Sequence, residues 1–230
     1  MPRVCVVCGR ELLLQEKNIC LPCLEELPLT YHWLRERNPM ADRLNAAIQG
    51  HCESYEPYSY ACALFFYDSL AGYSNIPQAL KYERNFRVGR QFAAMLAEKL
   101  AQCSYMNDVD AVIPVPLHFA RRWKRGYNQA EVIASKVAEA LGTPMRTDIL
   151  KRSRRTGTQT KLTAEQKAKN VRGAFKVPRK ILHKGLQAQH VLLIDDVFTS
   201  GSTMGECHRA LREAFGPQLR ISVATLACVM

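Results

Sequence analysis

The chain has 230 residues, of which 47% are hydrophobic and 23% are charged. This composition is typical of a globular protein with a sizeable core, and it excludes a disordered chain, a collagen and a coiled coil. With 32 Lys and Arg residues against 21 Asp and Glu residues, the formal net charge is +11. Such an excess indicates polyanionic partners, either nucleic acid or a polyphosphate substrate.

Four of the nine cysteines lie close together near the N-terminus: Cys5, Cys8, Cys20 and Cys23, with the spacing C-x2-C-x11-C-x2-C. Thiolates two residues apart can face one metal ion, and two such pairs complete a tetrahedron. A redox pair and unrelated buried thiols are the alternatives, but nothing here resembles the βαβ unit that a redox C-x-x-C normally follows. The spacing predicts a structural Zn²⁺ site in a four-cysteine zinc finger over residues 1–30.

The rest of the chain alternates between strand-like and helix-like segments. The sequence predicts a helical connector over residues 31–58 and a larger domain over residues 59–230. Short apolar runs predict strands at residues 60–67, 111–116, 191–194 and 221–229. Apolar residues at helical spacing predict helices over residues 88–100, 130–141 and 202–215. This alternation predicts an α/β fold with a mostly parallel sheet.

No apolar run approaches the roughly 18 residues that a membrane-spanning helix needs. The N-terminus also lacks the apolar core of a signal peptide. We therefore expect no membrane insertion and a cytoplasmic location.

Two basic clusters lie between the predicted strands, and the second falls in a polar stretch, residues 151–161, that predicts a loop. Their members are Arg121, Arg122, Lys124 and Arg125 in the first cluster, and Lys151, Arg152, Arg154, Arg155 and Lys161 in the second. Trp123 and Tyr127 are interleaved with the first cluster, and positive charge beside aromatic rings is what single-stranded DNA binding needs. Two alternatives stay open: the arginines close over a pyrophosphate, or they form a solvated face without a ligand.

The stretch from Val191 to Thr203 is the most informative. A buried strand delivers Asp195 and Asp196 to its carboxyl end, where open α/β sheets bind ligands. The residues that follow are small or hydroxylated and lead into a helix, whose N-terminus attracts anions. They are Thr199, Ser200, Gly201, Ser202 and Thr203. Because carboxylates repel phosphate, we expect the two acids to accept hydrogen bonds from vicinal sugar hydroxyls instead. The pattern predicts a ribose 5-phosphate site; Walker and dinucleotide motifs are absent.

This stretch resembles the phosphoribosyl pyrophosphate (PRPP) binding motif of type I phosphoribosyltransferases. Further segments narrow the resemblance to the ComF family, and they span nearly the whole chain in the family's order. They are the four-cysteine N-terminus, Leu80-Lys81-Tyr82, and residues 114–118, 121–129, 152–159 and 170–175. The resemblance implies a type I phosphoribosyltransferase fold behind a zinc finger, with a role in natural transformation, where imported single-stranded DNA is handled in the cytoplasm.

The resemblance also implies roles for individual residues. Asp195 and Asp196 are the catalytic candidates and contact the ribose hydroxyls, while residues 199–203 cradle the 5-phosphate. The loop of Val115, Pro116 and Leu117 corresponds to the one that holds pyrophosphate, and Lys81 is a candidate basic contact to it. Mg²⁺ is then held mainly by PRPP oxygens and water.

Two functions remain open. The first is a PRPP-binding protein that handles single-stranded DNA beside competence or recombination proteins. The second is an active phosphoribosyltransferase with a nucleobase or other nitrogen acceptor and no direct DNA role. The sequence does not reveal the acceptor. Residues 60–110 are the candidate for the hood, the variable region that selects the acceptor in type I enzymes, and they show no base-specific pattern.

Overall fold

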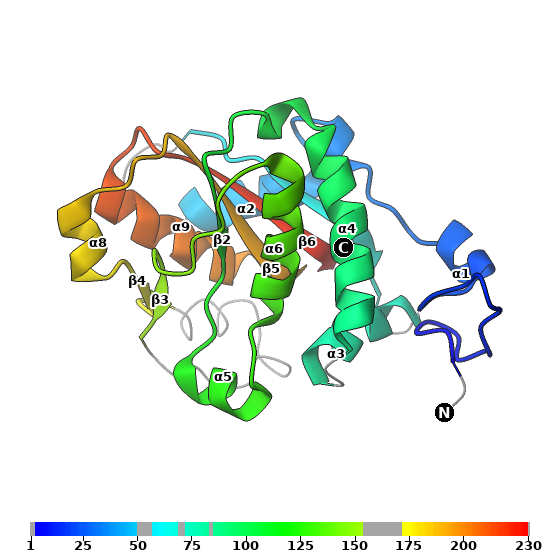
Figure 1. The fold of residues 1–230 in the computed structure, drawn as a ribbon. Helices are drawn as coiled ribbons and strands as arrows, with labels where there is room; N and C mark the ends of the chain where they lie inside the picture. The colour runs from blue at the N-terminus through cyan, green and yellow to red at the C-terminus, as the bar shows by residue number, and fades with distance from the viewer. Residues whose placement is uncertain (1–2, 50–56, 69–71, 83–84, 154–171, 230) are drawn as a thin grey trace.

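A four-stranded parallel sheet lies at the centre of the computed structural model, which describes residues 3–49, 57–68, 72–82, 85–153 and 172–229 (Figure 1). Its strand order is β1-β6-β5-β2. The strands are β1 (Ala61–Tyr67), β2 (Ala111–Pro114), β5 (His190–Phe198) and β6 (Arg220–Val229). The predicted α/β fold with a mostly parallel sheet is therefore confirmed.

Helices cover both faces of this sheet, as a parallel sheet requires. Alternate residues of β5 point to opposite faces. Leu192 and Ile194 join one core with α4 (Phe86–Ala101) and α6 (Gln129–Leu141), whereas Val191 and Leu193 join the other with α2 (Pro39–Gln49) and α9 (Ser202–Phe215). Figure 1 shows α4 and α6 in front of the sheet and α2 and α9 behind it.

Shorter elements connect these layers. They are the helices α1 (Leu21–Glu25), α3 (Asn75–Tyr82), α5 (Phe119–Arg125) and α8 (Arg179–Lys184), the strands β3 (Lys151–Arg152) and β4 (Phe175–Lys176), and 3₁₀ turns at His32–Leu34, Gly72–Ser74 and Ser104–Met106. Among the described residues, no helix is both long and apolar enough to cross a bilayer.

The N-terminal segment packs onto the larger fold through apolar side chains. Cys5, Leu12 and Ile19 belong to the same buried cluster as Phe92 of α4. The chain then runs antiparallel to the outer edge of β1, where Leu29 pairs with Phe65. The division at residues 30 and 58 stays a prediction.

Strands β5 and β3 differ from what the sequence predicted for their residues. β5 continues beyond Ile194 to Phe198, so the two acids lie within the strand instead of following it. Lys151 and Arg152 are not in a loop, because they pair antiparallel with β4, and the Arg152 guanidinium lies 5.1 Å from the centre of the Phe175 ring. Residues 154–161 of the predicted loop lie outside the described residues.

Candidate functional site

The two acids of β5 lie at the carboxyl edge of the sheet. Asp195 is half-buried and Asp196 is buried. Each carboxylate accepts a hydrogen bond from the next backbone amide, at 2.9 Å from Asp196 N to Asp195 Oδ1 and 2.8 Å from Val197 N to Asp196 Oδ1. These bonds fix both carboxylates near the end of β5, just before the turn of residues 199–203.

Lys81, at the end of α3, reaches this acid pair. Its Nζ lies 2.8 Å from Asp196 Oδ2. Burial alone would lower the pKa of Lys81, but the neighbouring Asp196 outweighs burial and raises it. The ammonium group is thus charged and held against the acids, although the two segments lie more than a hundred residues apart in the chain.

Asp195 is the less readily ionised acid of the pair. Burial and the charge of Asp196 raise the pKa of Asp195 to about 7, against the smaller opposing effects of Lys81 and Arg152. Burial also lowers the pKa of Arg152, as does the nearby charge of Arg121. Arg152 of the second predicted basic cluster therefore lies close to Asp195, and Arg121 of the first cluster lies close to Arg152. A site with two carboxylates and several cations can bind a ligand that carries both hydroxyls and anionic groups.

The turn after β5 packs closely against α2 at Gly201. Gly201 has φ of 77°, and a Cβ there would lie 3.1 Å from Phe198 Cζ and 3.3 Å from Ala47 Cβ of α2. The hydroxyls of Ser200 and Ser202 lie 2.9 Å apart. No described side chain caps the N-terminus of α9, so its first amides and the positive end of its dipole face the turn.

Arg43 of α2 supports this turn from behind. Its guanidinium donates to the carbonyl oxygens of Thr199 and Val229 and lies 5.6 Å from the centre of the Phe198 ring. Sequence reasoning missed Arg43, because it lies in the connector, 156 positions from Thr199, and no local pattern marks it.

The loop after β2 lies at the same edge of the sheet. Val115 N donates to Ile194 O at 2.8 Å, which places the loop directly beside the acid pair's strand. Asn128, which caps α6, donates from Nδ2 to Val115 O at 3.0 Å. Pro116 and Leu117 are half-buried. The structure therefore brings together Lys81, the β2 loop, the two acids and the turn.

The first basic cluster lies on α5 and is only partly at this site. Arg122 pairs with Glu131 at 3.0 Å, and the Arg125 guanidinium lies 5.3 Å from the centre of the Tyr82 ring. Trp123 is 89% exposed. Tyr127, by contrast, packs against Phe86 and donates to Leu80 O, so it does not form a joint platform with Trp123. The Lys124 side chain, Arg154 and Arg155 lie outside the described part of the structure.

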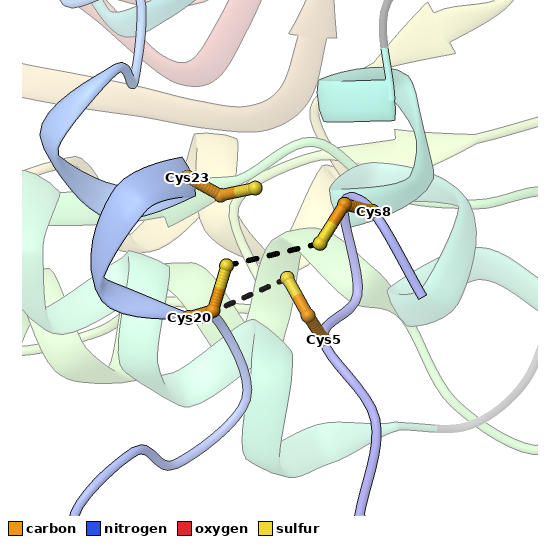
Figure 2. Close-up of side chains that lie close together, drawn as sticks. All are labelled: Cys5, Cys8, Cys20 and Cys23. Carbon is orange, nitrogen blue, oxygen red and sulfur yellow. Dashed lines mark hydrogen bonds between the residues drawn. The ribbon is translucent and has the colours of Figure 1, made fainter. Parts of the chain in front are cut away.

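The four N-terminal cysteines form a second site. Figure 2 shows their sulfur atoms pointing toward one another, and all four lie within 4.8 Å of each other. The 3.8 Å between the sulfurs of Cys8 and Cys20 fits a tetrahedron, because Zn–S bonds of about 2.3 Å place sulfurs about 3.8 Å apart.

Hydrogen bonds favour a thiolate at Cys20, whereas burial and the neighbouring thiols raise the pKa of Cys23. Val7 N and Cys20 N both donate to Cys5 Sγ at 3.4 Å. Burial alone would raise the pKa of Cys20, but hydrogen bonds from the Cys23 amide and from Arg10 lower it to about 6. The cluster can hold a metal ion, and an all-thiolate donor set fits zinc.

The fold is that of a phosphoribosyltransferase-type domain, and comparison with known proteins agrees. The family model for the phosphoribosyl transferase domain matches residues 87–229, which is more than half of the chain, so the chain belongs to this family. Competence protein F of Haemophilus influenzae is 28% identical over 215 residues, covering 91% of this chain and 90% of that protein. DNA utilization protein YhgH of Salmonella typhimurium is 26% identical over 220 residues, covering 92% and 91%.

These full-length similarities and the cysteine cluster confirm the predicted resemblance to the ComF family. Among solved structures, glutamine PRPP amidotransferase from B. subtilis, complexed with ADP and GMP, is 22% identical with a TM-score of 0.38. That match covers 58% of this chain and 26% of the other, a likeness too weak to add to the assignment.

Proposed function

We propose that the chain binds PRPP with Mg²⁺ at the carboxyl edge of its sheet and acts in handling imported single-stranded DNA during natural transformation. The observation that carries the PRPP assignment is the arrangement of the acid pair, with Lys81 on one side and the Gly201 turn on the other. Asp195 and Asp196 accept hydrogen bonds from the ribose 2- and 3-hydroxyls. The amides and hydroxyls of residues 199–203 bind the 5-phosphate, favoured by the positive end of α9.

The pyrophosphate end of PRPP fits the loop of Val115, Pro116 and Leu117. Lys81 supplies positive charge between this loop and the acids, and Arg121 and Arg152 lie near enough to add to it. Mg²⁺ would be held mainly by the phosphate oxygens of PRPP and by water, and it would neutralise the charge of the pyrophosphate.

We propose that the four-cysteine cluster holds a structural Zn²⁺. Four thiolates fill a tetrahedral site and leave no open coordination position, so the ion stabilises the N-terminal segment and takes no part in chemistry. Because Cys5, Cys20 and Cys23 belong to the core cluster that includes α4, the ion also helps to anchor this segment to the larger fold.

The DNA role is supported by the relatives' names, which speak of competence and of DNA utilization, and by the net charge of +11. The basic residues proposed to follow the phosphates are Arg121, Arg122, Lys124, Arg125, Arg152, Arg154 and Arg155. This role places the protein in the cytoplasm, beside competence or recombination proteins. A salt titration of oligonucleotide binding tests the second cluster: Arg154→Ala/Arg155→Ala lowers the salt slope if these residues contact phosphates, and an unchanged slope removes them from the site.

Isothermal titration calorimetry with PRPP–Mg²⁺ tests the PRPP assignment. Wild type is expected to bind, and Asp195→Ala/Asp196→Ala is expected not to. Asp148→Ala is the matched control, because Asp148 pairs with Arg146 on another part of the surface and its loss leaves the site intact. Equal binding by all three proteins would refute the site.

A second candidate function, transfer of the ribose 5-phosphate to a nitrogen acceptor, is favoured by the intact acid pair and its adjacent cations. In that reaction the bond between C1 and pyrophosphate breaks, positive charge develops on the ribose ring, and an acceptor nitrogen bonds to C1 and loses its proton as pyrophosphate leaves. Pyrophosphate release in the presence of nucleobases tests it. Binding of PRPP without release for any acceptor favours the DNA-handling function.

A further inference from the structure

Three exposed aromatic side chains lie on α5 or beside it. Phe119 and Trp123 of α5 are 76% and 89% exposed, and Tyr82, at the end of α3, is 71% exposed. Tyr82 is adjacent to α5 because the Arg125 guanidinium stacks over its ring. Figure 1 shows α5 projecting from the rest of the fold, between β2 and α6. Two exposed aromatic rings on one short helix indicate a binding surface.

The rings and the charges of α5 are sorted onto different sides of the helix. Four residues return an α-helix to nearly the same direction, so Phe119 and Trp123 share one face. Arg121 and Arg125 lie on the opposite side, toward Arg152 and Tyr82 respectively, and both are half-buried. Arg122 is exposed on the flank, where it pairs with Glu131. The rings of Phe119 and Trp123 are thus bordered by cationic groups, one of which, Arg121, lies toward Arg152 near the acid-pair site.

We propose that Phe119 and Trp123 form a stacking surface for the bases of single-stranded nucleic acid, with the α5 arginines contacting its phosphates. This inference rests on the proposed DNA-handling function and names the residues that perform it. Unpaired bases present planar faces that stack on aromatic rings regardless of sequence, while the phosphates supply the negative charge that the bordering arginines match. An acidic, apolar peptide is the rival occupant of such a surface.

The two tryptophans of the chain allow a direct test. Trp33 is 6% exposed, whereas Trp123 is 89% exposed, so a ligand that stacks at α5 changes the emission of Trp123. We expect a twenty-nucleotide oligothymidylate to quench this emission. An abasic oligomer of the same length, which has the phosphates but no bases, is expected to leave it unchanged. An acidic peptide that quenches Trp123 in place of the oligothymidylate would overturn the proposal in favour of the rival.

Variants separate stacking from a structural effect. Phe119→Ala/Trp123→Ala is expected to bind the oligothymidylate at least about tenfold more weakly, because the bases lose the rings on which they stack. Trp123→Phe keeps a ring and is expected to retain most of the affinity. Leu14→Ala, which removes a 93% exposed apolar side chain from the cysteine segment, is the matched control and binds as wild type.

Calorimetry of PRPP–Mg²⁺ with the same proteins keeps the two proposals apart. We expect Phe119→Ala/Trp123→Ala to bind PRPP as wild type does. If wild type fails to bind PRPP, the acid-pair site is refuted while the stacking result stands on its own. If wild type binds the oligothymidylate, but the double alanine variant binds it equally well, the α5 surface is refuted and DNA binding belongs elsewhere on the chain.

Discussion

Asp195→Asn is expected to stabilise the free protein above neutral pH while it weakens PRPP binding. The pKa of Asp195 is raised from 3.8 to about 7, chiefly by burial and by the charge of Asp196. At pH values between these two pKa values, Asp195 is protonated in the folded protein but ionised in the unfolded chain. The contribution of Asp195 to the stability of the protein is therefore greatest at low pH, and it falls as pH rises toward 7. Asparagine cannot ionise, and its Oδ1 can still accept the hydrogen bond from the Asp196 amide.

The size of the effect follows from the pKa shift. One pKa unit corresponds to about 1.4 kcal/mol, so the full shift would represent about 4 kcal/mol. Because Asp195 is half-buried and retains some contact with solvent, we halve this to about 2 kcal/mol. At pH 8 the Asn variant should then melt about 4–8 °C above wild type, since 1 kcal/mol moves the melting temperature of a protein of this size by about 2–4 °C.

Thermal unfolding followed by circular dichroism, without ligand at pH 5 and pH 8, measures this difference. Asp196→Asn is the matched control, and it should destabilise at both pH values because it leaves the Lys81 ammonium without its partner. PRPP–Mg²⁺ should raise the melting temperature of wild type but not that of Asp195→Asn. The reasoning fails if Asp195→Asn is no more stable than wild type at pH 8, or if it binds PRPP equally well.

The remaining predictions concern other parts of the molecule. Arg43→Leu should weaken PRPP binding about tenfold, because it leaves the carbonyl oxygens of Thr199 and Val229 without their donor. Arg43→Lys should restore part of the affinity. Calorimetry that shows no loss of affinity in Arg43→Leu refutes the positioning role of Arg43. Gly201→Ala should lose both stability, by about 1–2 kcal/mol, and PRPP affinity, whereas Gly142→Ala, which has a left-handed φ of 63° in open space, should lose stability alone. Equal PRPP affinity in the two glycine variants contradicts the role of the turn in binding PRPP.

Burial lowers the pKa of His208 from 6.5 to about 3, so its contribution to stability is present above pH 6.5 and is lost as the pH falls toward 3. Between pH 7 and pH 5 urea unfolding should show a loss of about 2 kcal/mol in wild type that His208→Leu lacks, and parallel losses in the two proteins contradict this. Purified protein should carry about one zinc per chain by metal analysis, and Cys20→Ser should lose zinc and thermal stability together. A metal-free wild type of unchanged stability contradicts the zinc site.

Sequence reasoning was most successful where the information is local. The helix predicted over residues 202–215 begins and ends at Ser202 and Phe215, because Gly201 precedes it and Gly216 follows it. The acids and the turn are contiguous in the chain, so their proximity needs no knowledge of the tertiary fold. The cysteine cluster is similarly encoded by spacing alone, since two C-x-x-C pairs joined by a short loop have few ways to place four sulfurs.

Contacts between distant segments were not predictable in the same way. Nothing local indicates that Arg43 reaches Thr199, or that Lys151 and Arg152 find a strand partner in Phe175–Lys176. Trp123 and Tyr127 are four residues apart and both lie in the first basic cluster, but Gly126, with φ of 81°, ends α5 between them, and Tyr127 packs against Phe86. Helical periodicity cannot show where a helix stops unless the glycine is recognised as its end.

The most direct test of the central claim is a crystal structure of the protein with PRPP and Mg²⁺. The account predicts the 5-phosphate on the amides of residues 200–203, the ribose hydroxyls within hydrogen-bond distance of Asp195 and Asp196, and the pyrophosphate beside Val115, Pro116 and Leu117. PRPP bound at another place on the molecule, with the turn after β5 making no phosphate contact, would contradict it.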